Sequence, residues 1–118
     1  MHIILGDDDL QQLEDKYTVL ELDQIRFNTE DGVVQAYCVL ENIPVDEIPK
    51  LDELAHLHHK LMENYSKRNW NFCEQALEHL TGKWGGQVDT FYTEISGRIA
   101  KYKQQDPGNN WDPAVQKY

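Results

Sequence analysis

The spacing of apolar residues changes once along this chain, and this change constrains the fold more than any other feature. Up to residue 44 the apolar residues fall in short runs typical of strands, whereas beyond it they recur every three or four positions, as on helices. Strand-type segments followed by helix-type segments predict an α+β fold. We expect a small antiparallel β-sheet, made of a hairpin and an N-terminal strand, followed by a three-helix bundle.

The predicted hairpin joins two strands through an Asp-Gly turn. Residues 18–27 are rich in β-formers, and the apolar parity changes near Asp23 and Gln24, which indicates a bulge or bend. The turn at residues 29–32 leads into residues 33–40, whose apolar character on both faces predicts a central strand. Two further elements are predicted before the hairpin: a third strand at Ile3–Leu5 and a helix over residues 7–16.

Three amphipathic helices are predicted after the hairpin, the first from the Asp46–Pro49 junction to about Lys67, then residues 70–80 and 87–103. Their apolar stripes would form the core of the bundle: Leu51, Leu54, His58, Leu61 and Tyr65; Trp70, Cys73, Ala76, Leu77 and Leu80; Val88, Phe91, Tyr92, Ile95, Ile99 and Tyr102. Residues 104–118 predict an irregular tail that Trp111 would pin. We expect a single domain over residues 1–118, with parts 1–45, 46–103 and 104–118.

The charge of the chain is strongly acidic and unevenly distributed. It has 118 residues with 11 Lys and Arg against 21 Asp and Glu, a net charge of −10. Residues 1–60 hold 14 of the acids and 4 of the bases, so the excess lies in this half. Nucleic acid and anionic membranes bind clustered Lys and Arg, which argues against either as the main partner. The acidic half predicts either a solvated surface or a patch for a basic partner.

The apolar segments and the cysteine content of the sequence predict the cellular compartment of the protein. Its apolar runs are shorter than the roughly 20 residues of a membrane span, and its first residues do not resemble a signal peptide. It has two cysteines, Cys38 and Cys73, where a small secreted domain would usually carry more. We therefore expect a cytoplasmic protein with two free, buried thiols, although a single disulfide is left open.

A histidine-rich run on the first predicted helix raises the alternative of a metal site. His56, His59 and Glu63 would share one helix face, and two imidazoles with a carboxylate suit zinc. The competing interpretation places His58 in the core and leaves His56 and His59 in solvent. It is favoured because a metal site needs a closed set of ligands. No other cofactor and no catalytic residue is predicted, and the chain is expected not to be an enzyme.

Trp84 stands in a glycine-rich segment, Gly82-Lys83-Trp84-Gly85-Gly86. The segment lacks the spacing of a phosphate-binding loop, so it predicts a connection between two helices. The indole of Trp84 would either pack down as a lid or stand out as an anchor for a partner.

Two resemblances complete this picture. The stretch 61–115 resembles the helical tail that follows the catalytic domain in many class III adenylate and guanylate cyclases, which implies a tetratricopeptide-like helical hairpin and no cyclase activity. The matching residues are Tyr65, Trp70, Cys73, Asp89, Tyr92, Arg98, Pro107, Trp111 and Asp112. Most of the chain is similar to uncharacterised small proteins of tailed phages of marine cyanobacteria, which implies an accessory protein in the host cytoplasm. That similarity rests on residues 17–23, 37–44, 82–84 and 89–92.

The expected function is a non-enzymatic, acidic protein–protein interaction module that binds a host or phage protein, with a basic partner favoured and a homodimer left open. The residues expected to bind are Trp84, Glu21, Asp23, Glu30 and Asp31. One alternative is an acidic inhibitor that imitates nucleic acid at a nucleic-acid enzyme. The second alternative is the metal-binding protein described above.

Overall fold

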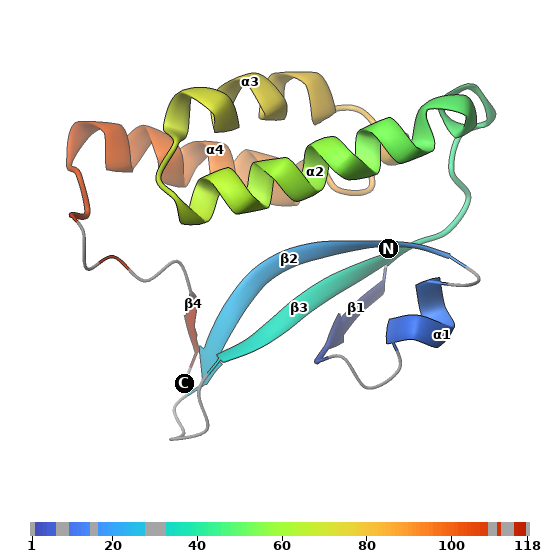
Figure 1. Cartoon of the computed structure of the whole chain (residues 1–118), viewed down its shortest axis with the longest axis horizontal. Coiled ribbons are helices and arrows are strands. Elements are labelled where there is room, and N and C mark those ends of the chain that lie inside the picture. Colours follow the sequence, from blue (N-terminus) through green and yellow to red (C-terminus); the bar gives the residue numbers. More distant parts are fainter. Residues whose placement is uncertain are drawn as a thin grey trace. The chain divides into compact units, whose positions relative to one another are not determined.

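The computed structural model describes residues 2–6, 10–14, 17–27, 33–108, 111 and 115–117. Its contacts divide the chain into two compact units. The sheet unit comprises residues 1–41 and 113–118, and the helical unit comprises residues 42–112. Antiparallel strands in one unit and helices in the other confirm the predicted α+β class (Figure 1). The prediction of a single domain stays a prediction.

The sheet unit contains a four-stranded sheet in the order β1-β3-β2-β4, with a short helix between the first two strands of the sequence. Strands β1, β3 and β2 are antiparallel neighbours, so the predicted hairpin and N-terminal strand are confirmed and β3 is central. The elements are β1 (His2–Leu5), α1 (Leu10–Glu14), β2 (Thr18–Phe27), β3 (Val33–Leu40) and β4 (Val115–Lys117).

The predicted irregularity in β2 is a bulge. The register against β3 shifts between Glu21 and Gln24, where two residues of β2 stand opposite one residue of β3. The side-chain amide of Gln35 fills the gap in the ladder by donating hydrogen bonds to the carbonyl oxygens of Leu22 (2.8 Å) and Ala36 (2.9 Å). The change of apolar parity in the sequence therefore marked a real break in the pairing.

The prediction of a wholly irregular tail is wrong for its last residues. Strand β4 pairs in parallel with Ile25–Phe27 of β2. A strand of three residues has almost no local signal, because its hydrogen bonds come from a partner about 90 residues away in the sequence. Upstream of it, Trp111 pins the tail as predicted, since its ring lies 5.2 Å from Tyr65, 5.4 Å from Trp70 and 5.3 Å from Tyr102, centroid to centroid.

The helical unit contains three α-helices, as predicted, with two short 3₁₀ segments. The first helix begins later than expected, because the residues around Pro49 form a 3₁₀ segment before the α-helix starts at Leu51. Proline lacks an N–H and is tolerated only near the start of a helix. The elements are η1 (Val45–Lys50), α2 (Leu51–Ser66), α3 (Trp70–Leu80), η2 (Trp84–Gly86) and α4 (Asp89–Gln104).

The predicted apolar stripes form the core of this unit. Most of their residues are buried, and the core histidine of α2 is confirmed. The buried side chains of the three helices are Leu54, His58, Leu61, Met62 and Tyr65; Cys73, Ala76, Leu77 and Leu80; Phe91, Tyr92, Ile95 and Ile99. Across the described ranges, no helix combines the length and the apolar character needed to cross a membrane.

Candidate functional site

Trp84 belongs to a buried polar network in the helical unit that is centred on the hydroxyl of Tyr92. Its indole Nε1–H donates a hydrogen bond to the hydroxyl of Tyr92 (3.0 Å), and that hydroxyl lies 2.9 Å from Nδ1 of His58. The three side chains are at most 1% exposed. Buried polar groups are almost always hydrogen-bonded, and here they are paired with one another. The network thereby links α2, η2 and α4 at one point.

The backbone around Trp84 is unusual as well. Trp84 (φ 58°), Gly85 (φ 63°) and Gly86 (φ 77°) are all left-handed. For a residue with a Cβ this conformation costs about 1–2 kcal/mol, so the surrounding contacts must hold Trp84 in place. One contact is its backbone N–H, which donates a hydrogen bond to the carboxylate of Glu47 in η1 (2.6 Å). A Cβ at Gly85 would lie 3.5 Å from the ring of Pro44, so the chain before η1 also packs on this loop.

This geometry corrects the expectation of Trp84 as an anchor for a partner. The indole is fully buried and its N–H is paired, so the ring packs down instead of standing out. The glycine-rich segment is a helix connection, as predicted, and the backbone N–H of Gly82 donates to the carboxylate of Asp89 (2.8 Å). Trp84 therefore positions η1 and makes no surface contact itself.

The segment that Trp84 holds displays two apolar side chains to solvent. Val45 is 82% exposed and Ile48 is 54% exposed. Residues three apart on a 3₁₀ helix lie one above the other, so these two side chains form a ridge, which we call the η1 ridge. Four acids lie close to it in the sequence: Asp46 and Glu47 in the first turn of η1, Asp52 and Glu53 in the first turn of α2.

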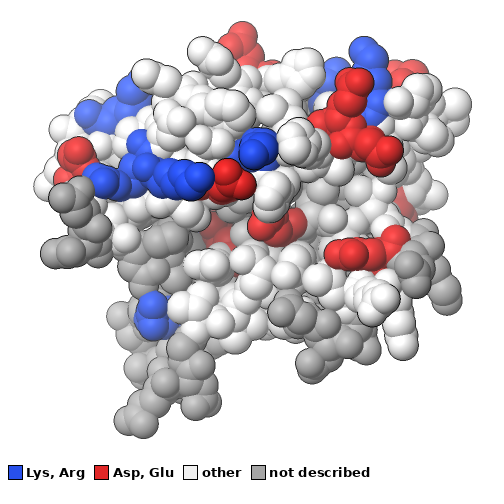
Figure 2. Space-filling model, viewed as in Figure 1, with Lys and Arg blue, Asp and Glu red and all other residues white. Residues whose placement is uncertain are grey.

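Basic residues occur at both ends of the helical unit. The last turn of α4 carries Lys101 and Lys103, at the opposite end from η1 in Figure 1. Figure 2 shows Lys and Arg at both the left and the right ends of the viewed face, with Asp and Glu among them. Acids near helix starts and bases near helix ends both complement the helix dipole. The η1 ridge is followed by acids at the start of α2, with Lys50 between the ridge and these acids.

The sheet unit has an exposed apolar pair of its own. Ile3 is 60% exposed and Leu5 is 53% exposed. They are two apart on a strand and so share one face of β1, which is an outer strand of the described sheet. Each unit thus exposes two neighbouring large apolar side chains.

The acidic residues predicted to bind are only partly described. Glu21 and Asp23 are half-buried on β2, where they lie on either side of Leu22 at the bulge. Both make contacts within the protein. Glu30 and Asp31 lie outside the described residues. The structure therefore places two of these four carboxylates on the sheet and does not test the hairpin turn.

The residues of the alternative metal site do not form a cluster. Glu63 lies 3.6 Å from Nε2 of His59 and 3.3 Å from Nζ of Lys67, so its carboxylate already has side-chain partners on its own helix or just after it. The hydrogen bond from Lys67 and the charge of Lys60 lower the pKa of Glu63. His56 is exposed on α2. Within the residues that the structure describes, no group of three His, Cys, Asp or Glu side chains is placed to hold a metal ion.

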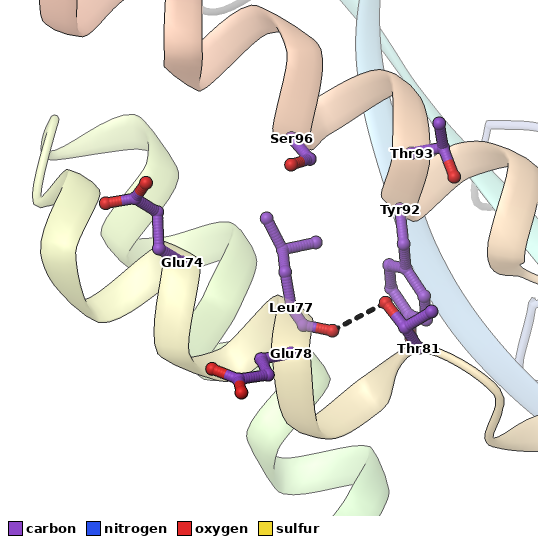
Figure 3. Close-up of a pocket in the computed structure, with 7 residues that line it drawn as sticks. All are labelled: Glu74, Leu77, Glu78, Thr81, Tyr92, Thr93 and Ser96. Carbon is purple, nitrogen blue, oxygen red and sulfur yellow. Dashed lines mark hydrogen bonds between the residues drawn. The ribbon is translucent and has the colours of Figure 1, made fainter.

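A shallow groove of about 360 Å³ runs between α3 and α4 (Figure 3). Its polar side chains do not converge on one point. Glu74 and Glu78 extend from α3 away from the hydroxyls of Thr93 and Ser96 on α4. The carboxylate of Glu74 also accepts a hydrogen bond from Nζ of Lys103 (2.6 Å). The groove is lined by Glu74, Leu77, Glu78, Thr81, Tyr92, Thr93 and Ser96.

Sequence reasoning missed the η1 ridge and the network beneath it. The sequence before Pro49 indicates only a junction, and no local pattern signals the exposure of Val45 and Ile48. A usable signal existed for the network, because His58 and Tyr92 carry polar atoms on apolar stripes and buried rings of this kind need partners. Comparisons with known protein families, with curated proteins and with solved structures find no match to this chain.

Proposed function

We propose that this protein is a non-enzymatic protein–protein interaction module of acidic character. The observation that supports this is the exposure of neighbouring large apolar side chains on both units: Ile3 (60%) with Leu5 (53%), and Val45 (82%) with Ile48 (54%). Single exposed apolar residues are common and need no explanation, whereas adjacent ones rimmed by charge are typical of binding surfaces.

The charge of the chain favours a different protein as the partner over a second copy. Two copies with a net charge of −10 each repel one another, and a basic partner is attracted. On the resemblance to phage proteins, this partner is a host or phage protein in the host cytoplasm. Charge alone would serve an imitator of nucleic acid equally well, but such a protein would not need the apolar pairs.

The test is affinity capture from cells that express the protein, with quantitative mass spectrometry, at low and physiological salt. The chain is compared with two double variants, Ile3→Ser with Leu5→Ser and Val45→Ser with Ile48→Ser. Val33→Ser is the matched control, because Val33 is a 40% exposed residue outside both pairs. We expect one dominant partner that at least one double variant loses and the control keeps.

Two outcomes would contradict the proposal. Capture of a nucleic-acid enzyme that both double variants retain, and that salt alone releases, would favour the imitator of nucleic acid. Absence of any partner that depends on either pair would remove the interaction module altogether. Circular dichroism of each variant ensures that a lost partner does not reflect a lost fold.

A further inference from the structure

We infer that the η1 ridge is a docking surface for one kind of partner, a basic amphipathic helix of another protein. This inference rests on the proposed function and names the chemistry of its partner. It depends on three features of the described residues: a rigid support beneath the ridge, its apolar shape and the sign of the charges around it.

The support beneath the ridge is the buried Trp84 loop. The backbone N–H of Trp84 donates to the carboxylate of Glu47, which lies between the two ridge residues in the sequence. The ring of Pro44, just before the ridge, lies close to Gly85, where an added Cβ would be 3.5 Å from it. A surface that is already held in one conformation loses little entropy on binding.

The shape of the ridge suits a helix. Three residues of a 3₁₀ helix rise by about 6 Å in total, which is close to the separation of side chains four apart on an α-helix. Val45 and Ile48 would therefore each contact an apolar residue of one stripe on the partner helix. This is a small contact of two side chains, so we expect moderate affinity.

The charges around the ridge select a basic partner. Asp46, Asp52 and Glu53 are exposed and close to it in the sequence, and Lys50 is the one basic residue between positions 45 and 53. Lys and Arg on either side of the partner's apolar stripe would meet these carboxylates. A second copy of the chain is disfavoured at this surface, because two ridges would bring like charges together.

The test uses a synthetic 14-residue amphipathic peptide built from Leu and Lys, with a Leu and Glu peptide of the same periodicity as its control. Binding to the full chain is followed by backbone amide NMR shifts and by calorimetry at two salt concentrations. We expect the Lys peptide to bind, with the largest shifts between residues 43 and 54, and the Glu peptide not to bind. Val45→Ser with Ile48→Ser should weaken binding about tenfold.

A second double variant isolates the electrostatic contribution to peptide binding. Asp52→Asn with Glu53→Gln should weaken binding at low salt and reduce its salt dependence, while the fold is unchanged because both side chains are exposed. Shifts spread evenly over all acidic segments, or binding that the ridge variant leaves intact, would overturn the inference. The proposed function would survive that result if a cellular partner still depended on Ile3 and Leu5, and would fail only if neither pair mattered.

Discussion

Burial decides the chemistry of both thiols in this protein. Cys38 and Cys73 are free and fully buried, as the sequence predicted. Loss of solvation raises the pKa of Cys38 to about 11 and that of Cys73 to about 12. Cys73 lies with its Sγ 3.7 Å from the carbonyl oxygen of Leu61, a contact that suits a protonated thiol. Neither side chain is placed to act as a nucleophile.

These raised pKa values predict a loss of stability at alkaline pH. The folded protein holds the thiol protons more tightly than the unfolded chain, so this contribution is complete below pH 9 and declines as the pH rises toward 11 for Cys38 and toward 12 for Cys73. Between pH 8 and 10.5 we expect the free energy of unfolding in urea to fall by about 4 kcal/mol more, about 2 kcal/mol for each thiol, in the native chain than in the variant with Cys38→Ala and Cys73→Ala. Equal slopes for the two chains would contradict this assignment.

Trp84 shows why single residues are hard to interpret from the sequence. A tryptophan among glycines is compatible with a buried lid and with an exposed anchor. Its burial follows from partners that are remote in the sequence, the carboxylate of Glu47 and the hydroxyl of Tyr92. Those partners hold the left-handed backbone at Trp84. The exposed apolar side chains of this region are Val45 and Ile48.

At the scale of elements, the bulge in β2 depends on one side chain. The amide of Gln35 donates to two backbone carbonyl oxygens, those of Leu22 and Ala36, beside the break in the ladder. Without those bonds, the two carbonyl oxygens would lack these hydrogen-bond donors in a partly buried site, and the fold would lose stability. The bulge therefore comes from two sources, the apolar parity of β2 and this side chain of β3.

Gln35→Glu should destabilise the fold by about 2–3 kcal/mol, because a carboxylate replaces the donor and faces two carbonyl oxygens. Gln24→Glu is the matched control, since Gln24 pairs with Gln35 across the ladder but is exposed. We expect the control to change stability by less than about 0.5 kcal/mol. Urea unfolding followed by circular dichroism measures both, and equal losses would show that the amide of Gln35 has no special part in the bulge.

Helix ends and the short strand β4 show where local patterns stop being informative. The helical periodicity placed α3 and α4 within about two residues, because apolar stripes extend over several turns. Asn69 occupies the N-cap position of α3, but its side chain donates to Asn64 (2.9 Å) and makes no capping bond. Such choices depend on which neighbours lie within reach in three dimensions.

At the scale of the whole molecule, like charges oppose folding. The sheet unit carries ten acids and three bases, and the helical unit eleven acids and eight bases. The ion pairs of the described residues, such as Arg98 with Glu94 (2.7 Å) and Lys103 with Glu74 (2.6 Å), are partly exposed and so are worth little each. Repulsion among the excess acids should therefore dominate.

Raising NaCl from 20 to 300 mM should increase the melting temperature by several degrees, since screening weakens this repulsion more than it weakens exposed ion pairs. Differential scanning calorimetry measures the shift. The variant with Asp52→Asn and Glu53→Gln has two fewer negative charges and should gain less from salt. A melting temperature that falls with salt would mean that the ion pairs stabilise the fold by more than the repulsion among the excess acids destabilises it.

The sequence by itself determined the α+β class, the three strands of the hairpin and N-terminus, the three helices and most of their buried stripes. It could do so because periods of two and of 3.6 residues are local properties of the chain. The tertiary structure alone decided that Trp84 is buried, that Val45 and Ile48 are exposed and that the tail ends in β4. Each of these depends on hydrogen bonds and packing between residues far apart in the sequence, and no local pattern encodes which distant groups meet.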